Sequence, residues 1–376
     1  MQYRRFGKTN LNLSVFSLGT MRYLASEENA YETVYRAIGL GINHLETARG
    51  YGDSEQYLGA ALKSGLPLSR HQLYITSKIL PTPDRDAMAW SIDQSLETLG
   101  IDYLDCLAIH GLNTWEHLAW VENSQGCMEA VQQAVAEGKI RHIGFSTHAP
   151  LEVILRAIAT EHFEFVNLHY YFFNQRNAPA VELAYEKDMG IFIISPSDKG
   201  GMLYTPPEIL TEFCQPFSPL ELNYRFLLSD RRITTLSLGA ANPTELDLPL
   251  RVADQAHPLT PEELTSFEHL QTHQKTVLAT DRCSQCYACL PCPEEINIPE
   301  VLRLRNLAVA YNMTGYGQYR YRMFENAGHW FPGRKGDCCT NCGECLPRCP
   351  ERLDIPKLLR DTHDRLNGEP KRRLWG

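Results

Sequence analysis

The first two thirds of the chain alternate between short apolar runs and longer stretches with the 3.6-residue period of amphipathic helices. The predicted strands are Val15–Gly19, Ile42–Thr47, Leu73–Lys78, Leu104–His110, His142–Ser146, Phe165–His169, Ile191–Ser195 and Ile233–Gly239. The predicted helices include Ser54–Lys63, Asp86–Leu99, Met128–Glu137, Leu151–Thr160, Ala180–Lys187 and Pro219–Leu228. Eight strands that alternate with helices indicate parallel β/α units, and eight is the number that closes a (β/α)8 TIM barrel.

The last third shows no such alternation. The stretch PLTPEELTSFEHLQTH predicts a helix with Thr260 as its N-cap, Pro261 in its first turn and Glu263 three residues after the cap. The Tyr- and Arg-rich segment 301–326 is also expected to be helical. We therefore expect a barrel domain at residues 1–257 and a mainly helical domain at residues 258–376.

The composition indicates a globular protein, with 43% hydrophobic residues and a net charge of -9. No secretory signal and no apolar run long enough to span a membrane is visible, so a cytoplasmic location without a membrane partner is expected. The only concentrated basic run is Lys371–Arg373, so nucleic acid is not an expected partner.

Nine of the twelve cysteines lie between Cys283 and Cys349. The stretch CSQCYACLPCP has the spacing C-x2-C-x2-C-x2-C-P, and CTNCGECLPRCP has the spacing C-x2-C-x2-C-x3-C-P. The sequences that follow also match, since CPEEINIPEVLR aligns with CPERLDIPKLLR. This is an internal duplication, with Pro299 and Pro356 each placed where a helix begins.

Grouped thiols in a reducing compartment more often hold metal than form disulfides. A short loop with three cysteines in step can supply three thiolates to three corners of an iron–sulfur cube, while the fourth ligand comes from elsewhere. Zinc is the alternative, although it prefers two separated C-x2-C pairs. Cys338 is a spare thiol that competes with Cys339 as a ligand. Cys106, Cys127 and Cys214 are most simply buried small hydrophobic residues.

Residues 281–360 resemble two-cluster bacterial ferredoxins, in which the cysteine before the proline serves the other cluster. The resemblance implies two 4Fe–4S clusters. One would be held by Cys283, Cys286, Cys289 and Cys349. The other would be held by Cys292, Cys339, Cys342 and Cys345. The first copy departs from the ferredoxin pattern because it has one residue fewer before its last cysteine.

The carboxyl ends of predicted strands two, three and four carry Glu46 with the nearby Tyr51, then Lys78, then His110. Active sites of TIM barrels lie at this end. The chain resembles the aldo-keto reductases through YRRFGKTNLNLS, GINHLETARGYGDSEQYLGAAL, LYITSKI, YLDCLAIHG, GKIRHIGFSTH and LSLGAANP. A branch of that family carries a C-terminal ferredoxin-like part, and this chain looks like that branch over nearly its whole length.

The resemblance implies hydride transfer, with Tyr51 as the proton donor to a carbonyl oxygen. Lys78 would lower the pKa of Tyr51, and His110 would orient the carbonyl. Glu46 stands where the family has aspartate and would hold Lys78. The alternative is that Glu46 and Lys78 form only a structural ion pair and that Tyr51 and His110 are loop and core residues, but four matching positions in sequence order favour the functional interpretation.

The resemblance also implies NADP(H) or NAD(H) as cofactor. Ser146 and Asn167, the latter in place of the usual glutamine, would contact the nicotinamide carboxamide. Ser195 lies where a stacking aromatic ring is expected. Backbone groups of Gly239, Ala240 and Asn242 would cradle phosphate. A flavin is a further candidate cofactor at the phosphate site.

The loop after the fourth predicted strand supplies Trp115, His117 and Trp120, which either line the substrate mouth or pack as a lid.

Three functions are consistent with the sequence. The first is an oxidoreductase acting on a small-molecule substrate, with clusters that exchange electrons with a redox protein such as ferredoxin. The second is a plain carbonyl reductase with structural or redox-sensing clusters. The third is a degenerate barrel that serves as a binding or electron-carrier module.

Overall fold

A computed structural model describes residues 1–369 of the protein. The chain forms two compact units. The first contains Met1–Gly200 and Asn223–Pro258, and the second contains Gly201–Leu222 and the chain from Leu259 onward. Segment 201–222 thus groups with the C-terminal unit, although it precedes the last barrel strand in sequence. The basic run Lys371–Arg373 lies outside the described residues.

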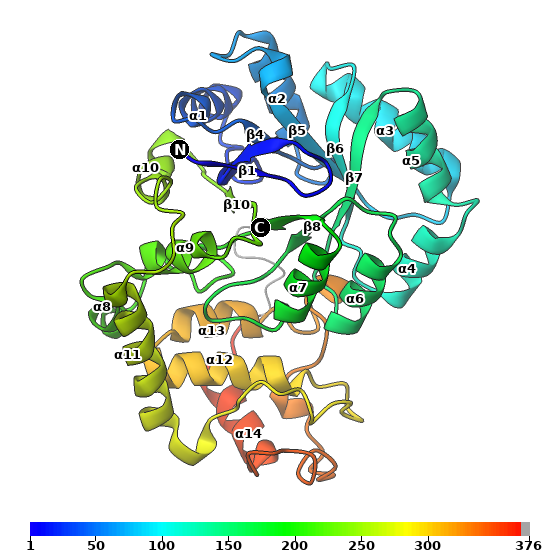
Figure 1. Ribbon diagram of the computed structural model, residues 1–376. Helices are drawn as coiled ribbons and strands as arrows, with labels where there is room; N and C mark the ends of the chain where they lie inside the picture. Colours follow the sequence, from blue (N-terminus) through cyan, green and yellow to red (C-terminus); the bar gives the residue numbers. More distant parts are fainter. Residues whose placement is uncertain (370–376) are drawn as a thin grey trace. The chain divides into compact units, whose positions relative to one another are not determined.

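The first unit is a closed barrel of eight parallel strands in the order β10-β3-β4-β5-β6-β7-β8-β9 (Figure 1). All eight predicted strands are confirmed within a few residues. Their bounds are β3 Phe16–Gly19, β4 His44–Glu46, β5 Tyr74–Ile79, β6 Leu104–His110, β7 Ile140–Ser146, β8 Phe165–Leu168, β9 Gly190–Ile193 and β10 Thr235–Leu238.

Helices cover the outside of the barrel, and every helix predicted in this part of the chain is present (Figure 1). They are α1 Glu27–Gly39, α2 Ser54–Lys63, α3 Arg85–Leu99, α4 Trp115–Glu122, α5 Cys127–Ala136, α6 Leu151–Ala159, α7 Ala178–Glu186, α9 Pro219–Ser229 and α10 Asp247–Leu250. The segment with Trp115, which the sequence suggested as a loop, is the helix α4. Its N-cap is Thr114, whose side chain accepts a hydrogen bond from His117 N.

An antiparallel hairpin of β1 (Tyr3–Arg5) and β2 (Asn12–Ser14) precedes the barrel. It belongs to a buried apolar cluster beside the first residues of β8 and β9. The members of this cluster are Phe6, Leu13, Cys106, Ala108, Phe165 and Phe192. Cys106 is fully buried in this cluster, so it is a core residue as predicted.

The second unit is helical, with α8 (Glu208–Cys214), α11 (Pro261–Leu278), α12 (Ile298–Tyr311), α13 (Thr314–Tyr321) and α14 (Ile355–Leu366). The predicted capping box of α11 is present, because Thr260 and Glu263 each bind the other's backbone N–H. Pro299 and Pro356 lie in the first turns of α12 and α14, as the duplication predicted.

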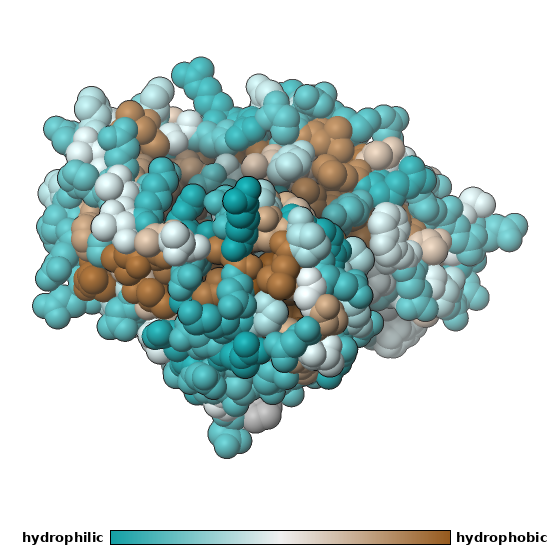
Figure 2. Space-filling view, turned by 90° about the horizontal axis from the view of Figure 1, so that it is seen from below, coloured by the Kyte–Doolittle hydropathy of each residue, from teal (hydrophilic) through white to brown (hydrophobic). Residues whose placement is uncertain are grey.

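No described helix is long and apolar enough to cross a membrane. The face seen in Figure 2 carries mainly hydrophilic side chains, with hydrophobic ones gathered in separate patches.

We predict that Gly144→Ala destabilises the barrel. A Cβ at this β7 position would lie 2.5 Å from the ring of Phe165, far inside contact distance. Overpacking of this kind lowers the free energy of unfolding by about 1–3 kcal/mol. Gly39→Ala is the matched control, because its Cβ would meet nothing within 4 Å. Thermal unfolding of both variants measures the difference, and equal stabilities would contradict the prediction.

Candidate functional site

The barrel brings the four predicted catalytic side chains to one end. Glu46 and His110 are the last residues of β4 and β6, Lys78 lies near the end of β5, and Tyr51 lies in the turn after β4. The carboxyl ends of parallel strands meet at the same rim, which is where TIM-barrel enzymes carry their active sites.

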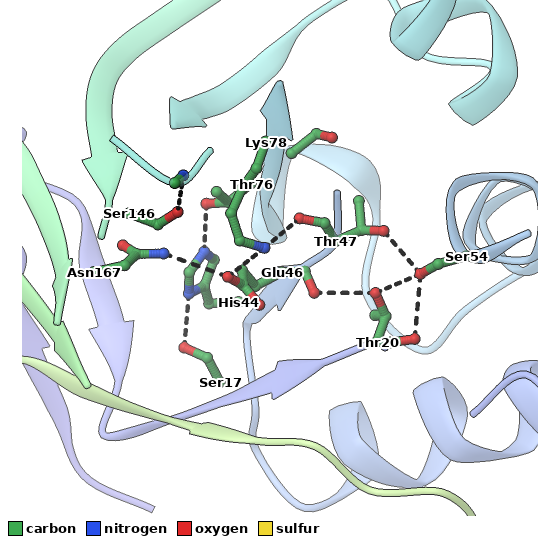
Figure 3. A network of polar contacts seen from close by, with 12 residues as sticks. Ser17, Thr20, His44, Glu46, Thr47, Ser54, Thr76, Lys78, Ser146 and Asn167 are labelled. Atoms are coloured by element: carbon green, nitrogen blue, oxygen red, sulfur yellow. Dashed lines mark hydrogen bonds and ion pairs between the residues drawn. The ribbon is translucent and has the colours of Figure 1, made fainter. Parts of the chain in front are cut away.

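Lys78 and Glu46 form a buried ion pair, with Lys78 Nζ 2.5 Å from Glu46 Oε1. Lys78 Nζ also donates a 2.6 Å hydrogen bond to Thr47 O (Figure 3). The side chains are only 1% and 4% exposed. Burial lowers the pKa of Lys78, but Glu46 and Tyr51 outweigh burial, so this pKa lies above its usual value. Lys78 therefore carries its positive charge at neutral pH.

The Tyr51 ring lies between this ion pair and His110. Lys78 Nζ is 4.5 Å from the centroid of the Tyr51 ring, and the rings of Tyr51 and His110 meet edge to face at 5.5 Å. Burial raises the pKa of Tyr51 above its usual value, and Lys78 offsets this only in part. The sequence predicted the direction of the Lys78 effect correctly but missed the larger effect of burial. The phenol therefore keeps its proton at neutral pH and can donate it.

The two predicted carboxamide-binding residues lie in one row with His110, because the strand register pairs His110 with Ser146 and Ser146 with Asn167. Ser146 Oγ accepts a 3.1 Å hydrogen bond from Gly111 N. Asn167 is fully buried, and its Nδ2 donates to Glu46 Oε1 at 3.3 Å (Figure 3). Asn167 Oδ1 has no hydrogen-bond partner among the residues described. It is a buried acceptor beside the ion pair.

A polar layer inside the barrel lies next to the ion pair, and sequence reasoning missed it. His44 Nδ1 is 2.6 Å from Ser17 Oγ, and His44 Nε2 is 2.7 Å from Thr76 Oγ1 (Figure 3). Burial, together with the charge of Lys78, lowers the pKa of His44 to about 3. This histidine is therefore neutral and supports the strands that carry Glu46 and Lys78. The sequence already indicated that His44 lies near the site, because residues two apart in a strand share a face and His44 is two residues before Glu46 in β4.

Ser195, which lies after β9 where the resemblance places a stacking aromatic ring, has a left-handed backbone with φ of 52°. The predicted phosphate-binding residues Gly239, Ala240 and Asn242 follow β10. Gly239 O accepts a 2.7 Å hydrogen bond from Arg22, which also forms an ion pair with Glu245. Asn242 caps the 3-10 helix η2 (Pro243–Leu246) by accepting from Thr244 N. Arg22 is a cation that the sequence reasoning missed, since it lies more than 200 residues before this loop.

A second cluster that was not predicted lies after β7 and β8. His169 Nδ1 is 2.5 Å from Tyr171 Oη, and His169 Nε2 is 3.2 Å from His148 Nδ1. His148 N donates to Asn113 Oδ1, so this cluster is joined to the loop after His110. Two histidines just beyond strand ends were the signal that could have drawn attention to it.

The cysteines of the second unit surround two recesses, each lined by four thiols. The first recess, of about 300 Å³ including space open to solvent, is lined by Cys283, Cys286, Cys289 and Cys349. The second, of about 330 Å³, is lined by Cys292, Cys339, Cys342 and Cys345. Each set combines three cysteines of one copy with the last cysteine of the other. These are the two sets that the ferredoxin resemblance assigned.

Burial, with smaller contributions from Cys283 and its neighbours, raises the pKa of Cys289 to about 12. Cys338 lies in neither recess lining and hydrogen-bonds to Glu325. Among the described His, Cys, Asp and Glu side chains, no group of three is arranged to hold a single metal ion.

Comparison with known proteins matches residues 16–271 to the family model described as Aldo/keto reductase family. The uncharacterized oxidoreductase YqkF of Bacillus subtilis (strain 168) is 26% identical over 312 residues, which cover 73% of this chain and 97% of YqkF. Methylglyoxal reductase DkgB of Escherichia coli O157:H7 is 33% identical over 153 residues, which cover 40% of this chain and 54% of DkgB. The chain thus spans about half the length of DkgB.

Two solved structures share the barrel fold. The holo form of aldo-keto reductase AKR11C1 from Bacillus halodurans has a TM-score of 0.62 and 24% identity, and the match covers 71% of this chain and 95% of that one. An aldo-keto reductase from Klebsiella pneumoniae in complex with NADPH has a TM-score of 0.59 and 20% identity, covering 72% of this chain and 94% of that one.

We predict that Glu46 and Asn167 are energetically coupled through their side-chain lengths. Glu46→Asp withdraws the carboxylate from Lys78 and Asn167, and Asn167→Gln adds a methylene in a fully buried position. Each change lowers the free energy of unfolding by about 1–3 kcal/mol. The double variant restores the combined length, so its loss is smaller than the sum by at least about 0.5 kcal/mol. Thermal unfolding of the four proteins tests the coupling, and strictly additive losses would contradict it.

Proposed function

The chain belongs to the aldo/keto reductase family of oxidoreductases, and from this premise we propose that its barrel exchanges hydride between NADP(H) and the carbonyl group of a small molecule. The observation that carries the proposal is the buried Lys78–Glu46 pair held against the Tyr51 ring at the carboxyl end of the strands. A purely structural ion pair would not need a phenol and an imidazole packed beside it.

In the proposed reaction, bound NADPH supplies the hydride to the carbonyl carbon. Tyr51 donates its phenolic proton to the carbonyl oxygen, which its raised pKa allows at neutral pH. Lys78, fixed by Glu46 and Thr47 O, stabilises the negative charge that the phenol acquires as the proton leaves. His110, edge-on to Tyr51, orients the carbonyl oxygen. The reverse reaction uses the same groups, with Tyr51 as the base.

The nicotinamide fits the polar groups beside the ion pair. Asn167 Oδ1 is a buried acceptor without a hydrogen-bond partner, so it suits the amide N–H of a carboxamide, and Ser146 lies next to it in the strand register. Backbone groups of Gly239, Ala240 and Asn242 form the proposed phosphate side. NADP(H) is proposed over NAD(H) because a structural neighbour is in complex with NADPH and because the cation Arg22 contacts this loop at Gly239 O.

We further propose that the two cysteine-lined recesses each hold a 4Fe–4S cluster, which supplies one-electron transfer. Four thiols around each recess match the ligand number of such a cluster, and the crossed origin of each set matches two-cluster ferredoxins. The clusters would pass electrons to or from a redox protein such as ferredoxin. Because NADPH gives two electrons together and a cluster takes one, a flavin in the barrel is the further cofactor that could connect the two reactions.

We predict that Tyr51→Phe lowers kcat for NADPH-dependent reduction of methylglyoxal by about 100- to 10,000-fold, because the proton donor is lost. The affinity for NADPH, measured by fluorescence, should stay unchanged. In the unaltered protein the rate should be constant through neutral pH and fall only as the pH rises through the raised pKa of Tyr51. The exposed Tyr35 gives the matched control, Tyr35→Phe. Full activity in Tyr51→Phe would overturn the proposed role.

We also predict about eight iron and eight acid-labile sulfide per chain in protein purified without oxygen. Cys349→Ala removes one ligand from the first recess and should lower both values to about four. Cys338→Ala, which changes a cysteine outside both recess linings, should leave them unchanged. Zinc without sulfide in the unaltered protein, or equal losses in the two variants, would contradict the cluster assignment.

A further inference from the structure

We propose that Arg348 makes the two cysteine-lined recesses electrically unequal, so that the cluster held by Cys292, Cys339, Cys342 and Cys345 has the higher reduction potential. This inference rests on the proposed iron–sulfur clusters. It concerns which of the two sites retains an electron.

Arg348 is the residue by which the two copies of the duplicated loop differ in length. The first copy reads CLPCP and the second reads CLPRCP, so the alignment places Arg348 as an insertion between Pro347 and Cys349. The insertion thus adds one positive charge to one copy without a counterpart in the other.

The side chain of Arg348 turns toward the second recess and lines it. Its Nη2 donates a 2.9 Å hydrogen bond to Pro291 O, which precedes Cys292. Its Nε donates a 2.9 Å hydrogen bond to Glu344 O, which precedes Cys345. The guanidinium is therefore fixed by backbone carbonyls beside two of the four thiols. Within residues 1–369 no carboxylate forms an ion pair with it, so its charge is not neutralised there.

Each recess also has one carboxylate at an equivalent position of the duplicated loop. Glu294 lines the second recess and Glu351 the first, and each is the second residue after the last cysteine of its copy. Arg334 lies 3.8 Å from Glu294 and partly offsets its charge. The lining of the first recess contains no Lys or Arg. The second recess therefore carries more positive charge than the first.

Reduction adds one negative charge to a cluster that is already anionic. A nearby cation stabilises the reduced form more than the oxidised form, and an unpaired carboxylate does the opposite. The two sites are joined through the chain at Arg348, since Arg348 lines the second recess and the adjacent Cys349 lines the first. A single electron shared by both clusters should therefore reside mainly in the second recess.

The test compares the two midpoint potentials in the intact protein and in Arg348→Gln, by anaerobic potentiometry with electron paramagnetic resonance. We expect two distinct potentials, of which Arg348→Gln lowers the higher one by about tenfold in the reduction equilibrium, or 59 mV for one electron. Arg348→Lys keeps the charge and should restore most of the difference. Glu351→Gln should instead raise the lower potential.

Equal shifts of both potentials, or none in Arg348→Gln, would overturn the inference while the cluster assignment stands, provided that iron and sulfide stay near eight each. If Arg348→Gln loses iron, Glu351→Gln still decides the question, because an unchanged lower potential would contradict the proposed inequality. A protein without iron and sulfide refutes the proposed clusters themselves, which separates that failure from this one.

Discussion

The charge of Lys78, held inside the barrel by Glu46, is the constraint on which the proposed site depends. An ammonium only 1% exposed is stable there because a carboxylate and a backbone carbonyl both contact it. The same charge adds to the effect of burial in lowering the pKa of His44, and it opposes the effect of burial on the pKa of Tyr51. The pKa values of two neighbouring residues thus depend in part on one ion pair. The strand ends that carry these residues are held in register by the closed barrel.

The resemblance to the aldo-keto reductases implies two departures at this ion pair, with Glu46 in place of aspartate and Asn167 in place of glutamine. The two side chains are joined by a hydrogen bond between Asn167 Nδ2 and Glu46 Oε1. Together they conserve the summed length of the pair while moving the polar contact toward β8. We interpret them as one coupled adjustment that keeps Lys78 in place.

In the second unit, a duplicated loop determines how the cysteines are arranged. Its duplicated loops place cysteines from both copies around each recess, and the helices that follow begin with Pro299 and Pro356 in equivalent first turns. Duplication makes the recesses similar, and the insertion of Arg348 makes them differ. The two recesses therefore have similar sets of four thiols, but only the second is lined by an arginine.

The sequence alone determined the features that depend on neighbouring residues. Apolar runs and helical periodicity predicted all eight barrel strands, and the capping box at Thr260 predicted the start of α11, because hydrogen bonds and side-chain faces repeat over a few residues. Cysteine spacing likewise indicated two loops that present several thiols. The tertiary structure alone decided which distant groups meet: Asn167 with Glu46, Arg22 with Gly239, and Arg348 with Pro291 O. It also decided the pKa of Tyr51, since that value is a balance between burial and charge that no local pattern encodes.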